Sequence, residues 1–238
     1  MSILENTVRN GNFSSSKIYN LLKVGRDKSS FGAPALNYIK QKKYERKMKR
    51  SISTEVDTRS ILWGKFLEPR VHNLIGMEYE HINDITLVHP KYDYWVGSPD
   101  FKIVKDKVVS DSKCPQPNAF CELIENCSQG IEYFKENHED YYWQLVSNAC
   151  ILGMDYIELI VYMPYESELQ EIRFEAENYD GLDQYKYRFI AESDKSQLAY
   201  LPDNSEYKNL NIFRFPLDKG DAILLESKVI AASIILKS

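Results

Sequence analysis

Four closely spaced segments between residues 82 and 112 constrain the fold most, because each has the composition of a β-strand. Runs rich in β-branched and aromatic residues predict strands at residues 82–88, 92–96, 101–104 and 108–112. Lys105 and Asp106 lie between the last two segments and predict the turn of a β-hairpin. The chain therefore needs a β-sheet, and an all-helical fold is excluded.

Helical patterns lie on both sides of this strand cluster. The three serines at 14–16 precede apolar residues and predict a short, serine-capped helix. Apolar periodicity predicts further helices at residues 35–50, 58–75, 118–135, 139–152 and 221–236. Pro69 predicts a kink or a fresh start in the second of these, and Gly153 stands at the usual C-terminal capping position of the fourth.

Two more strands are expected at residues 156–162 and 171–174. The order of helices and strands predicts an α/β or α+β fold with a mixed central β-sheet flanked by helices, and we take α/β as the fold class. The length of 238 residues suits a single domain over residues 1–238.

The charges are distributed unevenly along the chain. A net charge of −5 argues weakly against a polyanionic partner. However, residues 23–50 contain ten basic and two acidic residues, whereas the chain after residue 50 contains 18 basic and 32 acidic residues. This polarity fits one surface that meets phosphates and another that binds a cation. The alternative is a solvated helix face, and the charge pattern alone does not separate the two.

The composition argues against a membrane or secreted protein. The most apolar stretch, at residues 222–236, is interrupted by Glu226 and Lys228, and residues 1–11 lack the apolar core of a signal peptide. The cysteines match no zinc or redox motif, so we expect reduced thiols in a cytoplasmic protein with no membrane partner. These cysteines are Cys114, Cys121, Cys127 and Cys150.

Two short motifs bring acidic residues together with a lysine. They are residues 97–100 (Gly-Ser-Pro-Asp) and residues 111–115 (Asp-Ser-Lys-Cys-Pro). The predicted hairpin places Asp100 opposite Asp111, with Cβ atoms about 5 Å apart. Because side chains alternate along a strand, Lys113 shares this face with Asp111.

The close carboxylates predict a metal site. Asp100 and Asp111 repel each other unless a divalent cation or a proton intervenes, and Glu68, which the helical wheel places facing inward, supplies a third carboxylate. Hard oxygen ligands without a His or Cys partner predict Mg²⁺, with Mn²⁺ as a substitute. Lys113 would orient or deprotonate a water and offset charge on a pentacovalent phosphate, as metal-assisted phosphodiester hydrolysis requires. The alternative is an ordinary hairpin, on which Asp100 caps a turn and Asp111 pairs with Lys113 at the surface.

Five sequence blocks extend in order over most of the chain. They are residues 9–16 (RNGNFSSS), 63–68 (WGKFLE), 98–100 (SPD), 111–115 (DSKCP) and 142–144 (YWQ). Together they resemble the phage lambda-type 5′→3′ exonuclease, or YqaJ-like viral recombinase, family of the PD-(D/E)xK nuclease superfamily. This resemblance implies a restriction-endonuclease-like core.

The resemblance implies a metal-binding and catalytic group. Asp100 and Asp111 would be the principal metal ligands, with the backbone carbonyl of Ser112 completing the first site. Glu68 would serve a second metal or its waters, and Lys113 would act on the attacking water.

The resemblance also implies residues that line the site and bind the end of the DNA. Gln144 matches a glutamine that lines the family's active site, and Arg9 and Ser16 match residues that hold the terminal 5′-phosphate. Both suit a phosphate dianion, since one is a guanidinium and the other lies at a helix N-terminus. Two positions depart from the family: Asp111 stands where Glu is usual, and Phe101 stands where a small residue is common.

The family implies a Mg²⁺-dependent exonuclease that digests one strand of linear duplex DNA from its 5′-phosphorylated end. The product would be a 3′ single-stranded overhang for recombination. The resemblance further implies a homotrimer that encircles the DNA, a single-strand annealing protein as partner, and, for a bacteriophage protein, action in the cytoplasm of the bacterial host. Two alternatives stay open: a PD-(D/E)xK endonuclease, restriction-like or structure-selective, and a catalytically inactive protein that binds DNA ends.

Overall fold

Two β-sheets organise the computed structural model, which describes residues 8–27, 30–52, 57–82 and 85–237. The larger sheet has the order β2 (Glu80–His81), β5 (Phe101–Ile103), β6 (Val108–Lys113), β7 (Tyr156–Tyr162) and β8 (Leu210–Pro216). The smaller sheet has the order β1 (Phe13–Ser14), β4 (Tyr92–Gly97) and β3 (Leu87–His89). Each sheet contains one parallel pair, β6 with β7 and β1 with β4, so the predicted α/β fold with mixed sheets is confirmed.

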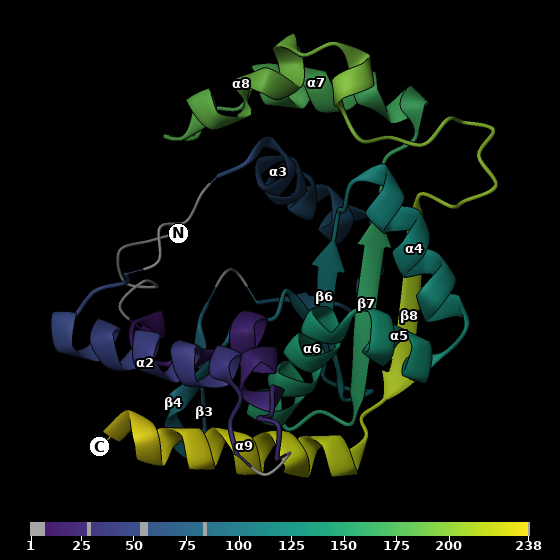
Figure 1. Cartoon of the computed structure of the whole chain (residues 1–238). Coiled ribbons are helices and arrows are strands. Elements are labelled where there is room, and N and C mark those ends of the chain that lie inside the picture. Colours follow the sequence, from purple (N-terminus) through teal and green to yellow (C-terminus); the bar gives the residue numbers. More distant parts are fainter. Residues whose placement is uncertain (1–7, 28–29, 53–56, 83–84, 238) are drawn as a thin grey trace.

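Helices flank these sheets on both sides and at both ends (Figure 1). Those before the large sheet are η1 (Ser15–Leu22), α2 (Ala33–Met48) and α3 (Arg59–Leu74). Those that follow β6 are α4 (Pro117–Ser128), α5 (Ile131–Asn137), α6 (Glu139–Leu152), η2 (Glu166–Glu168), α7 (Leu169–Glu177), α8 (Gln184–Glu192), η3 (Lys195–Gln197) and α9 (Lys219–Lys237). In Figure 1, α9 runs along the base beside α2, whereas α7 and α8 lie over α3 at the opposite end.

The core lies around the parallel pair β6 and β7. Every residue of β7 after Tyr156 is buried, as expected for a strand covered on both faces. This includes Glu158, which accepts hydrogen bonds from the Ser110 hydroxyl at 2.7 Å and from Arg214 Nε at 2.7 Å. Helix α6 packs against β6 and β7, and its C-cap Gly153 has φ of 68°, a left-handed conformation that favours glycine. The predictions at 139–152 and 156–162 are therefore confirmed.

The β5–β6 hairpin has the predicted register. Phe101 pairs with Ser110 and Ile103 with Val108, around a turn at residues 104–107. The next position along this register joins Asp100 to Asp111. The hairpin therefore brings the two acidic residues to neighbouring positions at the end of the strand pair.

Several predicted elements differ from the structure. The helix expected at 118–135 is divided into α4 and α5 by Gly130, whose φ of 115° breaks helical geometry. The strand expected at 171–174 lies within α7, because Leu169, Ile172 and Ala176 are buried at helical spacing. The strand expected at 82–88 is reduced to β3, with residues 83–84 outside the described part of the chain.

The N-terminal half contains further differences. Residues 15–22 form the expected short helix, but it is a 3₁₀ helix and the Ser14 side chain makes no capping hydrogen bond. Helix α3 continues without interruption through Pro69, so no fresh start occurs there. The sequence analysis assigned no element to residues 175–220, where the structure has helix α8 and strand β8.

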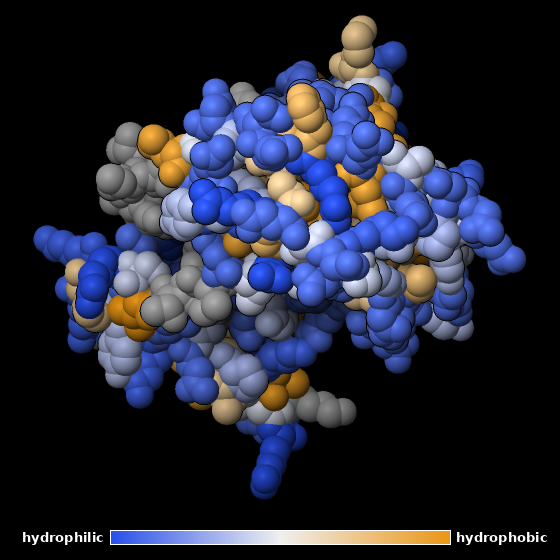
Figure 2. All heavy atoms as spheres, turned by 90° about the horizontal axis from the view of Figure 1, so that it is seen from above, coloured by the Kyte–Doolittle hydropathy of each residue, from blue (hydrophilic) through white to orange (hydrophobic). Residues whose placement is uncertain are grey.

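The surface seen from above is largely hydrophilic, with apolar side chains scattered over it (Figure 2). Phe174 and Leu182 are among the exposed apolar residues of the molecule. No helix in the described ranges combines the length and the apolar character needed to cross a membrane.

Candidate active site

Strand β6 and helix α6 together surround one buried carboxylate. Asp111 and Lys113 point to the same face of β6, as the strand period predicts, and the Lys113 amine forms an ion pair with Asp111 Oδ2. Gln144 on α6 donates a hydrogen bond from Nε2 to Asp111 Oδ1 at 2.9 Å. Only 2% of Asp111 is exposed, so this carboxylate lies behind the two side chains that bind it.

Asp100 approaches the same strand from the loop between β4 and β5. Its Oδ2 accepts hydrogen bonds from the backbone N–H of Ser112 at 2.6 Å and from the Ser112 hydroxyl at 2.7 Å. The N–H of Ser112 is thus occupied. Ser112 is in register with Ile160 of the neighbouring strand β7.

The carboxylates and the lysine perturb one another. Burial and the charge of Asp100 raise the pKa of Asp111 to about 6, although Lys113 and the Gln144 amide act in the opposite direction. Burial alone would lower the pKa of Lys113, but the charges of Asp111 and Asp100 raise it above its ordinary value. Lys113 is therefore a cation at neutral pH, suited to attract a phosphate or orient a water rather than to accept a proton.

The sequence analysis predicted that Glu68 faces the core, but this residue is exposed. Helix α3 buries Leu62, Leu67 and Val71, and this stripe leaves both Ile61 and Glu68 exposed. The prediction was wrong because the helical wheel was aligned on Ile61 rather than on the stripe that packs inward. Glu68 instead lines the site: it borders a small recess together with Asp100 and Ser112.

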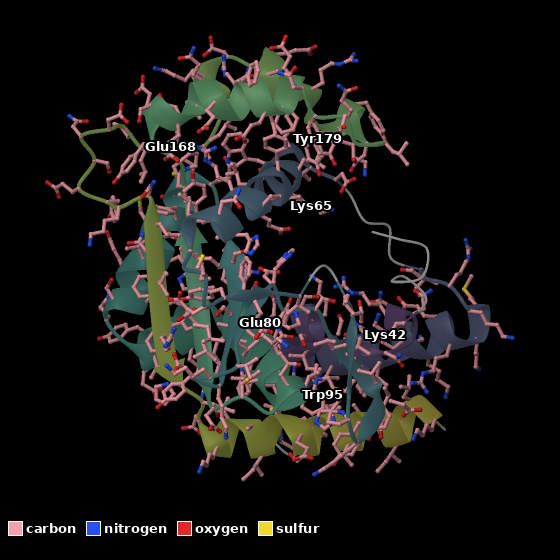
Figure 3. All side chains as sticks on the ribbon, turned by 180° about the vertical axis from the view of Figure 1, so that it is seen from behind. Lys42, Lys65, Glu80, Trp95, Glu168 and Tyr179 are labelled. Carbon is pink, nitrogen blue, oxygen red and sulfur yellow. The ribbon has the colours of Figure 1, made fainter. Side chains whose placement is uncertain are left out.

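One cleft of about 640 Å³ brings part of the predicted catalytic group together with the predicted phosphate-binding residues, but Asp100 and Asp111 do not line it. We call it the active-site cleft. Six of the predicted site residues line this cleft: Arg9, Ser16, Glu68, Ser112, Lys113 and Gln144. These residues come from the N-terminal segment, η1, α3, β6 and α6. Lys65 of α3 also lines it. Figure 3 shows Lys65 beside α3 and Lys42 beside α2.

Arg9 is connected to the Ser-Pro-Asp segment through a residue that the sequence analysis did not identify. Its Nε donates a hydrogen bond to the Thr86 hydroxyl at 3.1 Å, and that oxygen lies 3.0 Å from the Ser98 hydroxyl. No sequence pattern marks Thr86, because it lies in a loop 77 positions from Arg9. Tyr141, also not identified earlier, places its ring 5.2 Å from Lys113 Nζ.

The donor atoms of the site fit a divalent cation in type. Asp100, Asp111, Glu68 and the Ser112 carbonyl offer hard oxygens, which Mg²⁺ prefers. Burial, with a smaller contribution from the charge of Asp100, raises the pKa of Asp111. In the structure, Lys113 and Gln144 occupy the Asp111 oxygens, and no three His, Cys, Asp or Glu side chains of the described ranges are arranged to hold a metal.

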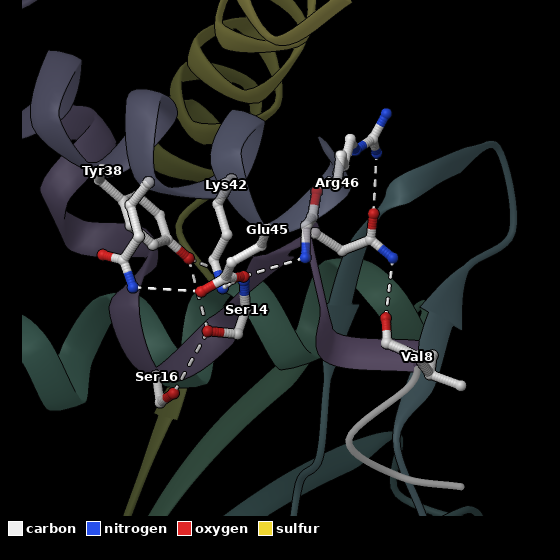
Figure 4. Close-up of polar contacts among 10 residues, drawn as sticks. Val8, Ser14, Ser16, Tyr38, Lys42, Glu45 and Arg46 are labelled. Atoms are coloured by element: carbon white, nitrogen blue, oxygen red, sulfur yellow. Dashed lines mark hydrogen bonds and ion pairs between the residues drawn. The ribbon is translucent and has the colours of Figure 1, made fainter. Parts of the chain in front are cut away.

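The basic stretch at 23–50 has mixed roles. Lys42 is buried in an ion pair with Glu45, and Arg46 bonds to the Gly11 carbonyl at 2.7 Å and to Asn12 at 2.8 Å (Figure 4). These side chains hold the N-terminal segment against α2. The four cysteines are free thiols, as expected.

Comparisons with known proteins give the family and the fold of this chain. The family model for the YqaJ-like viral recombinase domain matches residues 6–155. The fold resembles a crystal structure of an alkaline exonuclease (LHK-Exo) from Laribacter hongkongensis, with a TM-score of 0.66 and 15% identity over 99% of this chain and 93% of that chain. The structure of LHK-Exo in complex with dAMP gives a TM-score of 0.67 and 16% identity with the same coverage.

A phage-related exonuclease from Haemophilus somnus 129PT gives a TM-score of 0.58 and 12% identity over 94% of this chain and 92% of that chain. No match was found among curated protein sequences. The structural likenesses extend over nearly the whole chain, and the family match covers more than half of it, including Arg9, Asp111 and Gln144. This protein therefore belongs to the YqaJ-like viral recombinase domain family.

Proposed function

We propose that this protein is a Mg²⁺-dependent 5′→3′ exonuclease that digests one strand of linear duplex DNA from its 5′-phosphorylated end. The product is a 3′ single-stranded overhang that serves recombination. One observation carries the proposal: Arg9 and Ser16 line the same cleft as Lys113 and Gln144. An enzyme that enters at a 5′-phosphorylated DNA end needs a group that binds the terminal 5′-phosphate beside its hydrolytic group, and an endonuclease does not need a pocket for a terminal phosphate.

Each side chain has a role that its surroundings support. Arg9 and the Ser16 hydroxyl bind the terminal phosphate, since the guanidinium forms charge-assisted hydrogen bonds with such an anion. Lys113, held as a cation by the neighbouring carboxylates, attracts the phosphate to be cleaved and orients the attacking water. Gln144 fixes the orientation of Asp111 through its amide.

Asp100, Asp111, Glu68 and the Ser112 carbonyl would hold the metal. A bound Mg²⁺ supplies Lewis acidity and lowers the pKa of a coordinated water. Mn²⁺ has similar ligand preferences and should replace it. The family resemblance further supports a homotrimer around the DNA and a single-strand annealing protein as partner.

Digestion of linear duplex DNA tests the proposal. The substrates are a 5′-phosphorylated duplex, the same duplex with a 5′-hydroxyl, and a closed circular plasmid, each with Mg²⁺. We expect loss of linear DNA alone, faster with the 5′-phosphate, and Lys113→Ala should abolish it. Cutting of the closed circle would instead identify an endonuclease, and intact DNA that is shifted in a gel would identify a protein that only binds DNA ends.

A further inference from the structure

A second cavity of about 610 Å³ lies between η1 and α2, and its volume falls within the range of about 300–1,000 Å³ found for small-molecule sites. We call it the η1–α2 cavity. All but two of its lining residues are polar or charged, the exceptions being Pro34 and Tyr38. The lining consists of Arg9, Asn10, Ser14, Ser16, Lys17, Asn20, Pro34, Asn37, Tyr38, Gln41, Lys42, Glu45 and Ser51.

The two cavities share a wall. Arg9, Ser16 and Lys17 line both the η1–α2 cavity and the active-site cleft. A phosphate held by Arg9 and Ser16 therefore lies between two spaces, with the catalytic group on one side and the η1–α2 cavity on the other.

The charge of the η1–α2 cavity suits an anion. Its one carboxylate, Glu45, is already bound to Lys42 at 2.8 Å and to the N–H of Gly11 at 3.0 Å (Figure 4). Among the described residues, no carboxylate forms an ion pair with Arg9 or Lys17, and Arg9 donates a hydrogen bond from Nε to the Thr86 hydroxyl. Around them, amide and hydroxyl groups supply hydrogen-bond donors and acceptors for a sugar and a base.

We propose that the η1–α2 cavity binds the terminal nucleotide of a 5′ strand that extends one nucleotide beyond the duplex. The proposal rests on the function proposed above. With the extra nucleotide in this cavity, Arg9 and Ser16 hold the second phosphate instead of the first. The bond to be cleaved stays at the same distance from these residues, so the enzyme releases a dinucleotide from such an end.

The chemistry is the same hydrolysis shifted by one nucleotide. Water adds to the phosphorus and the bond from phosphorus to O3′ breaks. The dinucleotide leaves with a 3′-hydroxyl, and the shortened strand keeps the new 5′-phosphate. No further reactant is required.

The length of the first product tests the proposal. Two 5′-phosphorylated duplexes are digested, one blunt and one with a single-nucleotide 5′ extension. We expect mononucleotides from the blunt end and a dinucleotide as the main first product from the extended end. A wild-type enzyme that releases only mononucleotides from both ends overturns the proposal.

Filling the cavity provides the matched variant. Asn37→Trp places a large side chain at an exposed lining position on α2, and Lys40→Trp places it one turn further along α2, outside the lining. Asn37→Trp should lower the yield of the dinucleotide about tenfold, equivalent to about 1.4 kcal/mol, and leave the blunt end unaffected. Lys40→Trp should change neither product. A normal dinucleotide yield from Asn37→Trp contradicts the proposal.

A binding measurement separates this proposal from the exonuclease proposal. The dissociation constants of a 5′-phosphorylated mononucleotide and dinucleotide are measured in EDTA, so that no turnover is needed. We expect the dinucleotide to bind about tenfold more tightly, and Asn37→Trp to remove only this difference. Inactivity on blunt ends with this difference intact would refute the exonuclease alone, whereas equal affinities in the wild-type protein would refute the cavity proposal alone.

Discussion

At the scale of single residues, the hydroxyl of Thr86 connects Arg9, which we propose binds the terminal phosphate, to the Ser-Pro-Asp segment. It accepts from Arg9 Nε and lies within hydrogen-bond distance of Ser98, two positions before Asp100. Thr86 is half-buried and does not line the active-site cleft. We therefore treat it as a positioning residue that fixes the direction of the guanidinium.

Thr86→Val tests this role, because valine keeps the shape of threonine and loses its hydroxyl. A hydrogen bond to a charged group contributes about 1.5–3 kcal/mol, so KM for 5′-phosphorylated duplex should rise about tenfold or more. The value of kcat and the rate on a 5′-hydroxyl duplex should stay nearly constant. Steady-state kinetics on both substrates gives the answer, and Thr86→Ser should restore the wild-type KM. Equal losses on the two substrates would indicate a merely structural role.

The repulsion between Asp100 and Asp111 predicts that a divalent cation stabilises the protein. Metal at about 100 times its Kd adds about 2.7 kcal/mol to the free energy of unfolding, equivalent to about 5–10 °C in Tm. Thermal unfolding with and without Mg²⁺ or Mn²⁺ measures this shift. Asp111→Asn should reduce it, whereas Asp93→Asn, which alters an exposed carboxylate of β4, should not. An unchanged Tm in the wild-type protein with millimolar metal would count against the metal site.

At the scale of elements, α2 fixes the segment that leads into η1. Glu45 accepts a hydrogen bond from the Gly11 N–H and Arg46 donates one to the Gly11 carbonyl, so both sides of this residue are held. Gly11 has φ of 72°, and a Cβ there would lie 2.3 Å from Arg46 Cγ. The position of Arg9, two residues earlier, therefore depends on α2.

The Glu45 carboxylate predicts an acid-sensitive contribution to stability. Burial alone would raise its pKa, but hydrogen bonds from Lys42 and from the Gly11 N–H hold it below the ordinary value of 4.5. Because the folded pKa is lower than the unfolded one, ionised Glu45 stabilises the fold above the ordinary pKa. This stabilisation is lost as the pH falls through the folded pKa.

Glu45→Gln should therefore lower the free energy of unfolding by about 3 kcal/mol at neutral pH and by less in acid. Urea unfolding at pH about 7 and about 4 measures both values. Glu192→Gln, which removes the partner of Arg188 in an exposed pair, should change stability by less than about 1 kcal/mol. A cost of Glu45→Gln that does not vary with pH would contradict the linkage.

The elements also show how far the sequence determines the structure. Helix α6 and strand β7 were predicted with their observed ends, because the sequence pattern of each extends over its whole length and Gly153 marks the boundary between them. The four residues 171–174 fit both the period of a strand and the period of a helix. Only the packing of α7 shows that they form a helix. Side-chain direction was the weakest part: Glu68 lines the site from an exposed position, and the link through Thr86 has no sequence signal.

At the scale of the whole molecule, η2, α7 and α8 form an arm over α3 (Figure 1). Arg70 forms ion pairs between this arm and α3, the helix that bears Glu68, beside the contacts of Phe66 with Tyr179 and Tyr187. Arg70 contacts Glu168 of η2 at 3.4 Å, Glu175 of α7 at 3.1 Å, and Glu171 of α7. The Arg70 side chain is only 15% exposed, so three acidic residues share one largely buried cation.

This arrangement has a consequence for amide hydrogen exchange. Strand β7 lies between β6 and β8 in the larger sheet and is almost wholly buried, so its amides should exchange only through global unfolding. Helices α7 and α8 bury a smaller share of their residues, so residues 169–192 should open separately. Arg70→Ala should accelerate deuterium uptake at 169–192 and leave 156–162 unchanged. Equal acceleration in both regions would show a single cooperative unit. Separate opening would expose the face of α3 that packs against the arm while the sheet stays protected. The α3 wall of the active-site cleft would then lose this support at a rate that does not depend on global unfolding.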